Sequence, residues 1–113
     1  MAIRKPCRVT FLDEKTEEVY EHLSPDDEIK KHIKRAIEDI KQNAFCGIQI
    51  PKRLIPKEYI QKYQITNLWK YDMPMGWRLL YTITTPTKAE IISLIIEWFN
   101  HKEYEKRFRY LFW

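Results

Sequence analysis

The chain has 113 residues and is expected to form one domain over residues 1–113, because it is too short for two full hydrophobic cores. Its net charge of +4 is unevenly spread: residues 1–47 carry 9 basic and 10 acidic side chains, and residues 48–113 carry 11 basic and 6 acidic ones. Only two glycines are present, which excludes glycine-rich phosphate loops, and no apolar run approaches the roughly 18–20 residues of a membrane span. The basic second half favours an anionic partner.

Targeting and redox signals are sparse. No charged and then apolar signal segment opens the sequence, so we expect a cytoplasmic protein. Cys7 and Cys46 stand apart from each other and from any His at ligand spacing. We therefore expect two free thiols and no metal site.

A strand and a short helix are expected first. Residues 3–12 alternate loosely between apolar and polar side chains, and Pro6 favours a strand near the edge of a sheet. Asp13 is the expected N-cap of a helix that runs to about Leu23.

The second helix is expected over residues 25–45. Ser24 is the predicted N-cap, because it precedes a proline at the first helical position and acidic residues in the first turn. Apolar residues then recur at helical spacing. Gly47 is the predicted stop.

The second half of the chain predicts mostly strands. In chain order we expect a strand at 48–50, a proline-bounded connection over 51–66 with a short helix at 56–63, a hairpin of strands at 67–73 and 76–85, a strand at 90–99, and a turn or helix over 100–110. Residues 90–99 are apolar on both faces apart from Ser93 and Glu97, which predicts a central strand. The fold class that follows is α+β, with a helical hairpin packed on one face of a mostly antiparallel four-stranded sheet.

Two motifs carry a resemblance to a known family. Residues 67–83 read Asn-Leu-Trp-Lys-Tyr-Asp-Met-Pro-Met-Gly-Trp-Arg-Leu-Leu-Tyr-Thr-Ile, and residues 100–104 read Asn-His-Lys-Glu-Tyr. The first stretch resembles the hairpin of the RelE/ParE superfamily of toxins, with its basic residue, glycine turn and following aromatic-Arg-aliphatic-aliphatic-Tyr. The second resembles the region after the last strand where these toxins keep a His or Arg, and often a Tyr. The element order is similar over nearly the whole chain, and the motifs over about residues 67–110.

The resemblance implies a RelE-like toxin of a toxin-antitoxin pair. Such proteins are metal-independent endoribonucleases without a cofactor, which cut mRNA on the ribosome and so inhibit translation. The implied partners are the ribosome, mRNA and a cognate antitoxin protein that wraps around the toxin. Some members instead inhibit DNA gyrase, an alternative that His101 argues against.

The family pattern assigns four catalytic candidates. Arg78 lies at the family's Arg position in the second hairpin strand, and Lys70 lies near its basic position in the first. His101 falls where several members place a catalytic His, and Tyr104 falls near a position where others use Tyr. The connection over residues 51–66 is longer than in the simplest members, so its basic residues match no family position.

The chemistry of these side chains leaves structural alternatives open. RNA cleavage without a metal needs a base for the 2′-hydroxyl, cations on the phosphate and an acid for the leaving 5′-oxygen. An imidazole titrates near neutral pH, so His101 suits the acid or base role, although it could also be a surface His at a strand end. Tyr104 could stack, take part in catalysis, or only pack a terminal turn.

The two hairpin cations also have two interpretations. The planar fork of Arg78 suits a phosphate, but the same side chain could pair with Asp72 or Glu97 as part of the structure. Lys70 could line the same surface across the hairpin, or be an exposed lysine.

Basic residues outside the hairpin are candidates for RNA contacts. A basic rim in the 51–66 connection could follow a phosphate backbone or be solvated loop charge. The tail over residues 107–113 interleaves Arg with aromatic residues, which suits base stacking, burial in the core or contact with a partner. The RNA-binding candidates are Lys52, Arg53, Lys57, Arg107 and Arg109, with Lys62 in the same rim.

A second function remains open. With one convincing proton carrier, His101, the chain could be a catalytically inactive toxin-fold protein that binds ribosomal RNA or a protein partner.

Overall fold

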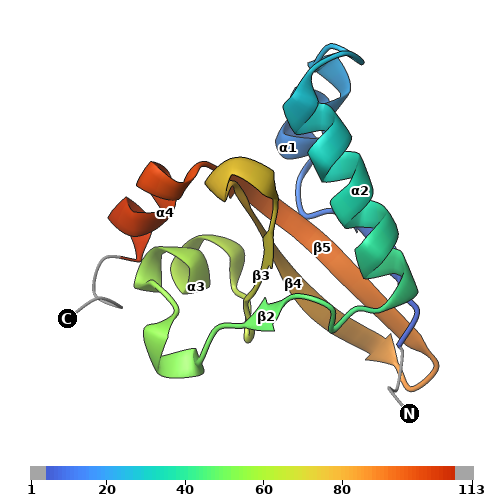
Figure 1. The fold of residues 1–113 in the computed structure, drawn as a ribbon. Helices are drawn as coiled ribbons and strands as arrows, with labels where there is room; N and C mark the ends of the chain where they lie inside the picture. The colour runs from blue at the N-terminus through green and yellow to red at the C-terminus, as the bar shows by residue number, and fades with distance from the viewer. Residues whose placement is uncertain (1–4, 109–113) are drawn as a thin grey trace.

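Helices cover both faces of a single mixed sheet (Figure 1). The protein is represented by a computed structural model that describes residues 5–108. In chain order its elements are β1 (Arg8–Phe11), α1 (Glu14–His22), α2 (Glu28–Gln42), β2 (Ile48–Gln49), the 3₁₀ turn η1 (Lys52–Leu54), α3 (Lys57–Tyr63), β3 (Trp69–Asp72), the 3₁₀ turn η2 (Pro74–Gly76), β4 (Arg78–Thr87), β5 (Glu90–Phe99) and α4 (His101–Arg107).

The sheet has five strands in the order β1-β5-β4-β3-β2. β1 runs parallel to β5, and every other neighbouring pair is antiparallel. The α+β class is confirmed, but the expected four-stranded sheet is wrong, because all five expected strands join it, including the short one at Ile48–Gln49, which pairs with Lys70 and Trp69. The central position predicted for residues 90–99 is confirmed, since β5 lies between β1 and β4.

The longer helix begins later than its sequence predicts. Asp27, not Ser24, is the N-cap of α2: its side chain accepts a hydrogen bond from the Ile29 backbone N–H at 2.9 Å. Ser24 instead accepts through its carbonyl from the Asp27 N–H at 2.9 Å, which makes a turn ahead of the helix. Three acidic residues follow Pro25, and the second of them is the capping carboxylate.

Gly47 is required by a close approach and not by the end of the helix. α2 ends at Gln42, and the backbone N–H of its C-cap, Asn43, bonds back into the last turn. A Cβ atom on Gly47 would lie 2.6 Å from the Lys70 carbonyl oxygen and 2.7 Å from the Tyr81 hydroxyl. Gly47 therefore lets the chain pass close to β3 and β4.

One face of the sheet packs against α2. Ile33, Ala36 and Ile40 of this helix are fully buried. They join Leu79 and Ile95 in one apolar cluster. Burial of this helical stripe against the sheet is the main stabilising contribution on this face.

The opposite face is covered by α3 and α4 (Figure 1). Leu80 and Ile96 are buried there together with Tyr59, Tyr104 and Phe108. The rings of Tyr104 and Phe108 stack with centroids 4.8 Å apart, and those of Tyr59 and Phe108 with centroids 6.0 Å apart. Helices therefore lie on both faces and not on one, which agrees with the apolar character of β5 on both sides.

Candidate functional site

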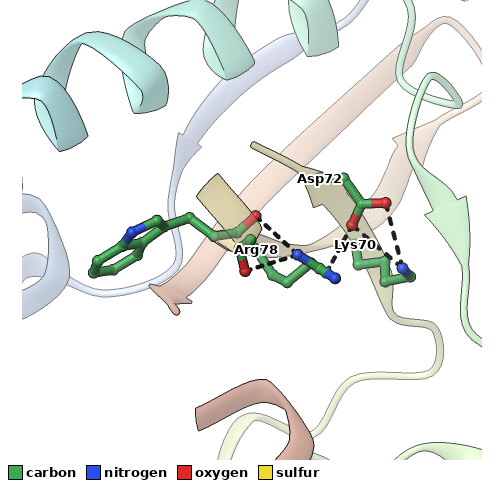
Figure 2. Close-up of polar contacts among 5 residues, drawn as sticks. Lys70, Asp72 and Arg78 are labelled. Carbon is green, nitrogen blue, oxygen red and sulfur yellow. Dashed lines mark hydrogen bonds and ion pairs between the residues drawn. The ribbon is translucent and has the colours of Figure 1, made fainter. Parts of the chain in front are cut away.

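The hairpin of β3 and β4 places three charged residues on the face that α4 covers. Side chains alternate along a strand, so Lys70 and Asp72 of β3 point to the same face. Asp72 is directly opposite Arg78 in the antiparallel register. Figure 2 shows the Asp72 carboxylate between the two cationic groups.

The Asp72 carboxylate bridges the two cations. Its Oδ1 lies 2.9 Å from the Arg78 Nε and 3.2 Å from the Lys70 Nζ. The side chains of Lys70 and Arg78 are only 17% and 16% exposed, whereas that of Asp72 is 47% exposed. The carboxylate is therefore the more solvent-facing part of the cluster.

Backbone oxygens of the hairpin turn hold the Arg78 guanidinium from its other side. Its Nη1 donates to the Gly76 carbonyl at 2.7 Å and to the Trp77 carbonyl at 3.4 Å (Figure 2). The position of Arg78 is therefore set by its own hairpin as well as by Asp72.

Tyr104 of α4 lies against both cations. The Arg78 Cζ is 5.1 Å and the Lys70 Nζ 5.4 Å from the centroid of its ring, which is the geometry of cation–π contacts. Burial raises the pKa of Tyr104, while Arg78 acts to lower it and Asp72 to raise it. The hydroxyl is thus protonated at neutral pH and can donate a hydrogen bond, but it is a poor base.

His101, the first residue of α4, lies against the same hairpin turn. Gly76 has a φ of +79°, and a Cβ atom there would come within 3.0 Å of the His101 Cβ. Gly76 thus serves two purposes, because its carbonyl holds Arg78 and its missing side chain makes room for His101. The His101 Nε2 lies 2.6 Å from the Glu105 carboxylate, and both side chains are about half exposed.

Arg107 lies on α4 but forms a different set of contacts. It pairs with Glu103 at 2.6 Å and Glu97 at 3.5 Å, and its guanidinium lies 4.7 Å from the Phe99 ring centroid. It lines a pocket of about 620 Å³ between α3 and α4. Among the described residues this pocket is lined by Glu58, Tyr59, Lys62, Tyr63, Glu97, Lys106 and Arg107.

The remaining RNA-binding candidates are not gathered at the hairpin. Lys52 and Arg53 of η1 and Lys57 of α3 are exposed. Within residues 5–108, the carboxylate of the hairpin site, Asp72, pairs with Lys70 and Arg78 and with none of these three cations. Arg109 lies outside the described residues.

Two acidic partners complete the site. Asp72 was expected only as a possible structural partner of Arg78, and its position two residues after Lys70 on one strand is the signal that links it to both cations. Glu105 was not predicted, although its spacing of four residues from His101 is a helical signal.

The described part of the chain contains neither a metal-binding cluster nor a membrane-spanning helix. Over residues 5–108, no group of three His, Cys, Asp or Glu side chains is arranged to hold a metal ion. Cys7 and Cys46 are free thiols. In the same part of the chain, no helix has the length and apolar character needed to cross a bilayer.

Comparison of the chain with models of known protein families, with curated proteins and with solved structures gives no match. The resemblance to RelE-like toxins therefore stays a prediction from the sequence.

Proposed function

We propose that the protein is a RelE-like, ribosome-dependent and metal-independent mRNA endonuclease. The observation that carries the proposal is a convergence at one end of one sheet face. Lys70 and Arg78 lie together across the hairpin, and the ring of Tyr104 contacts both. His101 begins the helix that carries Tyr104 and lies against the turn that holds Arg78.

The four side chains supply the groups that cleavage without a metal needs. In the reaction the RNA 2′-oxygen attacks the phosphorus, the bond to the 5′-oxygen breaks, and a proton passes from the first oxygen to the second. Arg78 and Lys70 would stabilise the negative charge that develops on the phosphate. His101 would take or give the proton, with Glu105 orienting its ring, and Tyr104 would act as a hydrogen-bond donor.

The partners follow from the same proposal. Ribosome-bound mRNA would be the substrate, and a cognate antitoxin protein would be the inhibitor, in the cytoplasm. The exposed cations Lys52, Arg53 and Lys57 would contact RNA backbone away from the cleaved phosphate. No cofactor enters the reaction.

A cleavage assay on programmed ribosomes tests the proposal. We expect Arg78→Ala to lower the cleavage rate about 100-fold, because it removes a donor to the transition state, and His101→Ala to lower it at least about tenfold. Arg8→Ala is the matched control, since Arg8 pairs with Glu90 on the surface and lies on β1. If both site variants stay within about tenfold of the wild type, the residue assignment is wrong.

A catalytically inactive, toxin-fold binder of ribosomal RNA or protein is the second candidate. It is favoured by two neutralising contacts, because Asp72 pairs with both hairpin cations and Glu105 pairs with His101. Stable, salt-sensitive binding to ribosomes with intact mRNA would support this candidate against the endonuclease.

A further inference from the structure

Lys70 and Arg78 form an anion-binding arrangement that already contains one anion. The Asp72 Oδ1 lies within 3.2 Å of the Lys70 Nζ and 2.9 Å of the Arg78 Nε. Within residues 5–108, no other carboxylate forms an ion pair with either cation. The cluster therefore has one negative and two positive charges, and the two cations are largely buried. Its net charge of one positive unit favours the binding of an anion from solution.

Contacts other than those with Asp72 hold the two cations in place. The Gly76 carbonyl accepts from the Arg78 Nη1 at 2.7 Å. The Tyr104 ring lies 5.1 Å from the Arg78 Cζ and 5.4 Å from the Lys70 Nζ. The cations therefore keep these supports when the Asp72 carboxylate moves away.

Asp72 is the member of the cluster that can leave most easily. It is the last residue of β3, and its side chain is 47% exposed. The Arg78 Nε, although 2.9 Å from the carboxylate, is buried and has no aligned hydrogen-bond partner. The contact with Arg78 is thus an ion pair without a directed hydrogen bond, and a phosphate oxygen could satisfy that donor better. The directed hydrogen bonds to Asp72 come from the Lys70 Nζ alone, at 3.2 and 3.5 Å, and a phosphate oxygen can accept these as well.

We propose that Asp72 closes a phosphate site formed by Lys70 and Arg78, and that an incoming phosphate group displaces its carboxylate. The carboxylate then acts as an internal competitor that weakens binding of isolated phosphate groups. The identification of that group as an RNA phosphodiester rests on the proposed function, whereas the site itself does not. Displacement also places the phosphate beside the Tyr104 ring and hydroxyl.

Phosphate binding by charge variants tests the proposal. Asp72→Asn removes the competing charge and keeps the shape, and Asp72→Glu keeps the charge. Glu90→Gln is the matched control, because it removes a carboxylate that pairs with Arg8 at 2.9 Å on the surface. Each folded variant is titrated with inorganic phosphate and with a short single-stranded oligouridylate, without ribosomes, and the backbone amides of residues 70–78 are followed by NMR.

We expect Asp72→Asn to bind both probes roughly tenfold more tightly than the wild type. Asp72→Glu and Glu90→Gln should stay within about threefold of the wild type. Tighter binding of inorganic phosphate alone would contradict RNA as the displacing ligand.

Two results would overturn the proposal. One is a folded Asp72→Asn variant that binds phosphate no better than the wild type. The other is failure of both Asp72→Asn and Asp72→Ser to fold, since Asp72 would then be a structural counter-ion. The titrations need neither ribosomes nor cleavage, so the two proposals can fail separately. If Asp72→Asn binds phosphate more tightly but the wild-type protein does not cleave mRNA on ribosomes, the endonuclease proposal is refuted and this inference stands.

Discussion

The two faces of the β3–β4 hairpin are built from alternate residues of the same strands and have opposite character. Leu79 and Tyr81 face α2 and lie in a fully buried cluster. Lys70, Asp72 and Arg78 lie on the other face, where Tyr104 of α4 contacts the two cations and Asp72 is half exposed. The comparison shows that both faces contribute a buried core, but only the end of the α4 face also holds charged side chains against an aromatic ring.

Adjacent leucines of β4 give the largest expected effect. Leu79 and Leu80 are both fully buried but belong to opposite faces. We expect Leu79→Ala and Leu80→Ala each to lower the free energy of unfolding by about 2–5 kcal/mol, measured by urea denaturation. Leu80 pairs with Lys70 in the sheet, so only Leu80→Ala should also lower cleavage by the folded protein. Equal losses of cleavage in both variants would contradict the separation of the faces.

A buried tyrosine supplies the next effect. The Tyr81 hydroxyl donates to the Ala44 carbonyl at 2.8 Å and accepts from the Gly47 N–H at 3.1 Å. We expect Tyr81→Phe to lower the free energy of unfolding by about 1–3 kcal/mol, because both backbone groups lose their partner. Tyr63→Phe, on the partly buried side of α3, is the control and should change stability by less than about 0.5 kcal/mol. A neutral Tyr81→Phe would show that water replaces the hydroxyl.

The same tyrosine predicts a loss of stability in alkali. Burial raises the pKa of Tyr81, with a further contribution from Cys46, and burial also raises the pKa of Tyr59 and Tyr71. A folded-state pKa above the unfolded value of about 10 gives stability that is complete below about pH 10 and is lost as the pH rises further. The urea midpoint should therefore fall as the pH rises above about 10, and less steeply in Tyr81→Phe. An unchanged slope in that variant would refute the role of Tyr81.

The smallest expected effect separates packing from chemistry at Tyr104. Its ring stacks on Phe108 and contacts both hairpin cations, whereas its hydroxyl forms no hydrogen bond within residues 5–108. We expect Tyr104→Phe to change the free energy of unfolding by less than about 0.5 kcal/mol and to lower cleavage about threefold, through one lost hydrogen bond. Tyr104→Leu, which also removes the ring, should lose stability as well. If Tyr104→Phe cleaves as fast as the wild type, the Tyr104 hydroxyl has no role in cleavage and the residue contributes only packing.

Much of the candidate site could be predicted because hairpins obey local rules. Residues alternate between the faces of a strand, and a glycine turn fixes which residues of the two strands are opposite. These rules were enough to expect Lys70 and Arg78 on one surface. The contact of Tyr104 with both cations depends on where α4 packs, which no local rule specifies.

The errors in the predicted fold arise where several local signals compete. Both Ser24 and Asp27 can cap a helix, and the side chain that bonds the first free N–H decides where α2 begins. The strand at Ile48–Gln49 was expected, but its place as the fifth strand of the sheet depends on the edge that β3 offers. Coverage of the second sheet face by α3 and α4 follows from burial of Phe108 and its stacked rings.

The sequence by itself determined the α+β class, the hairpin and the basic character of the second half, because propensity, alternation and charge are local or additive properties. Only the tertiary structure decided how that charge is used. It places Asp72 between Lys70 and Arg78 and leaves Lys52, Arg53 and Lys57 exposed on η1 and α3. The physical reason is that charge interactions depend on distance and burial, and both are set by packing between elements far apart in the chain.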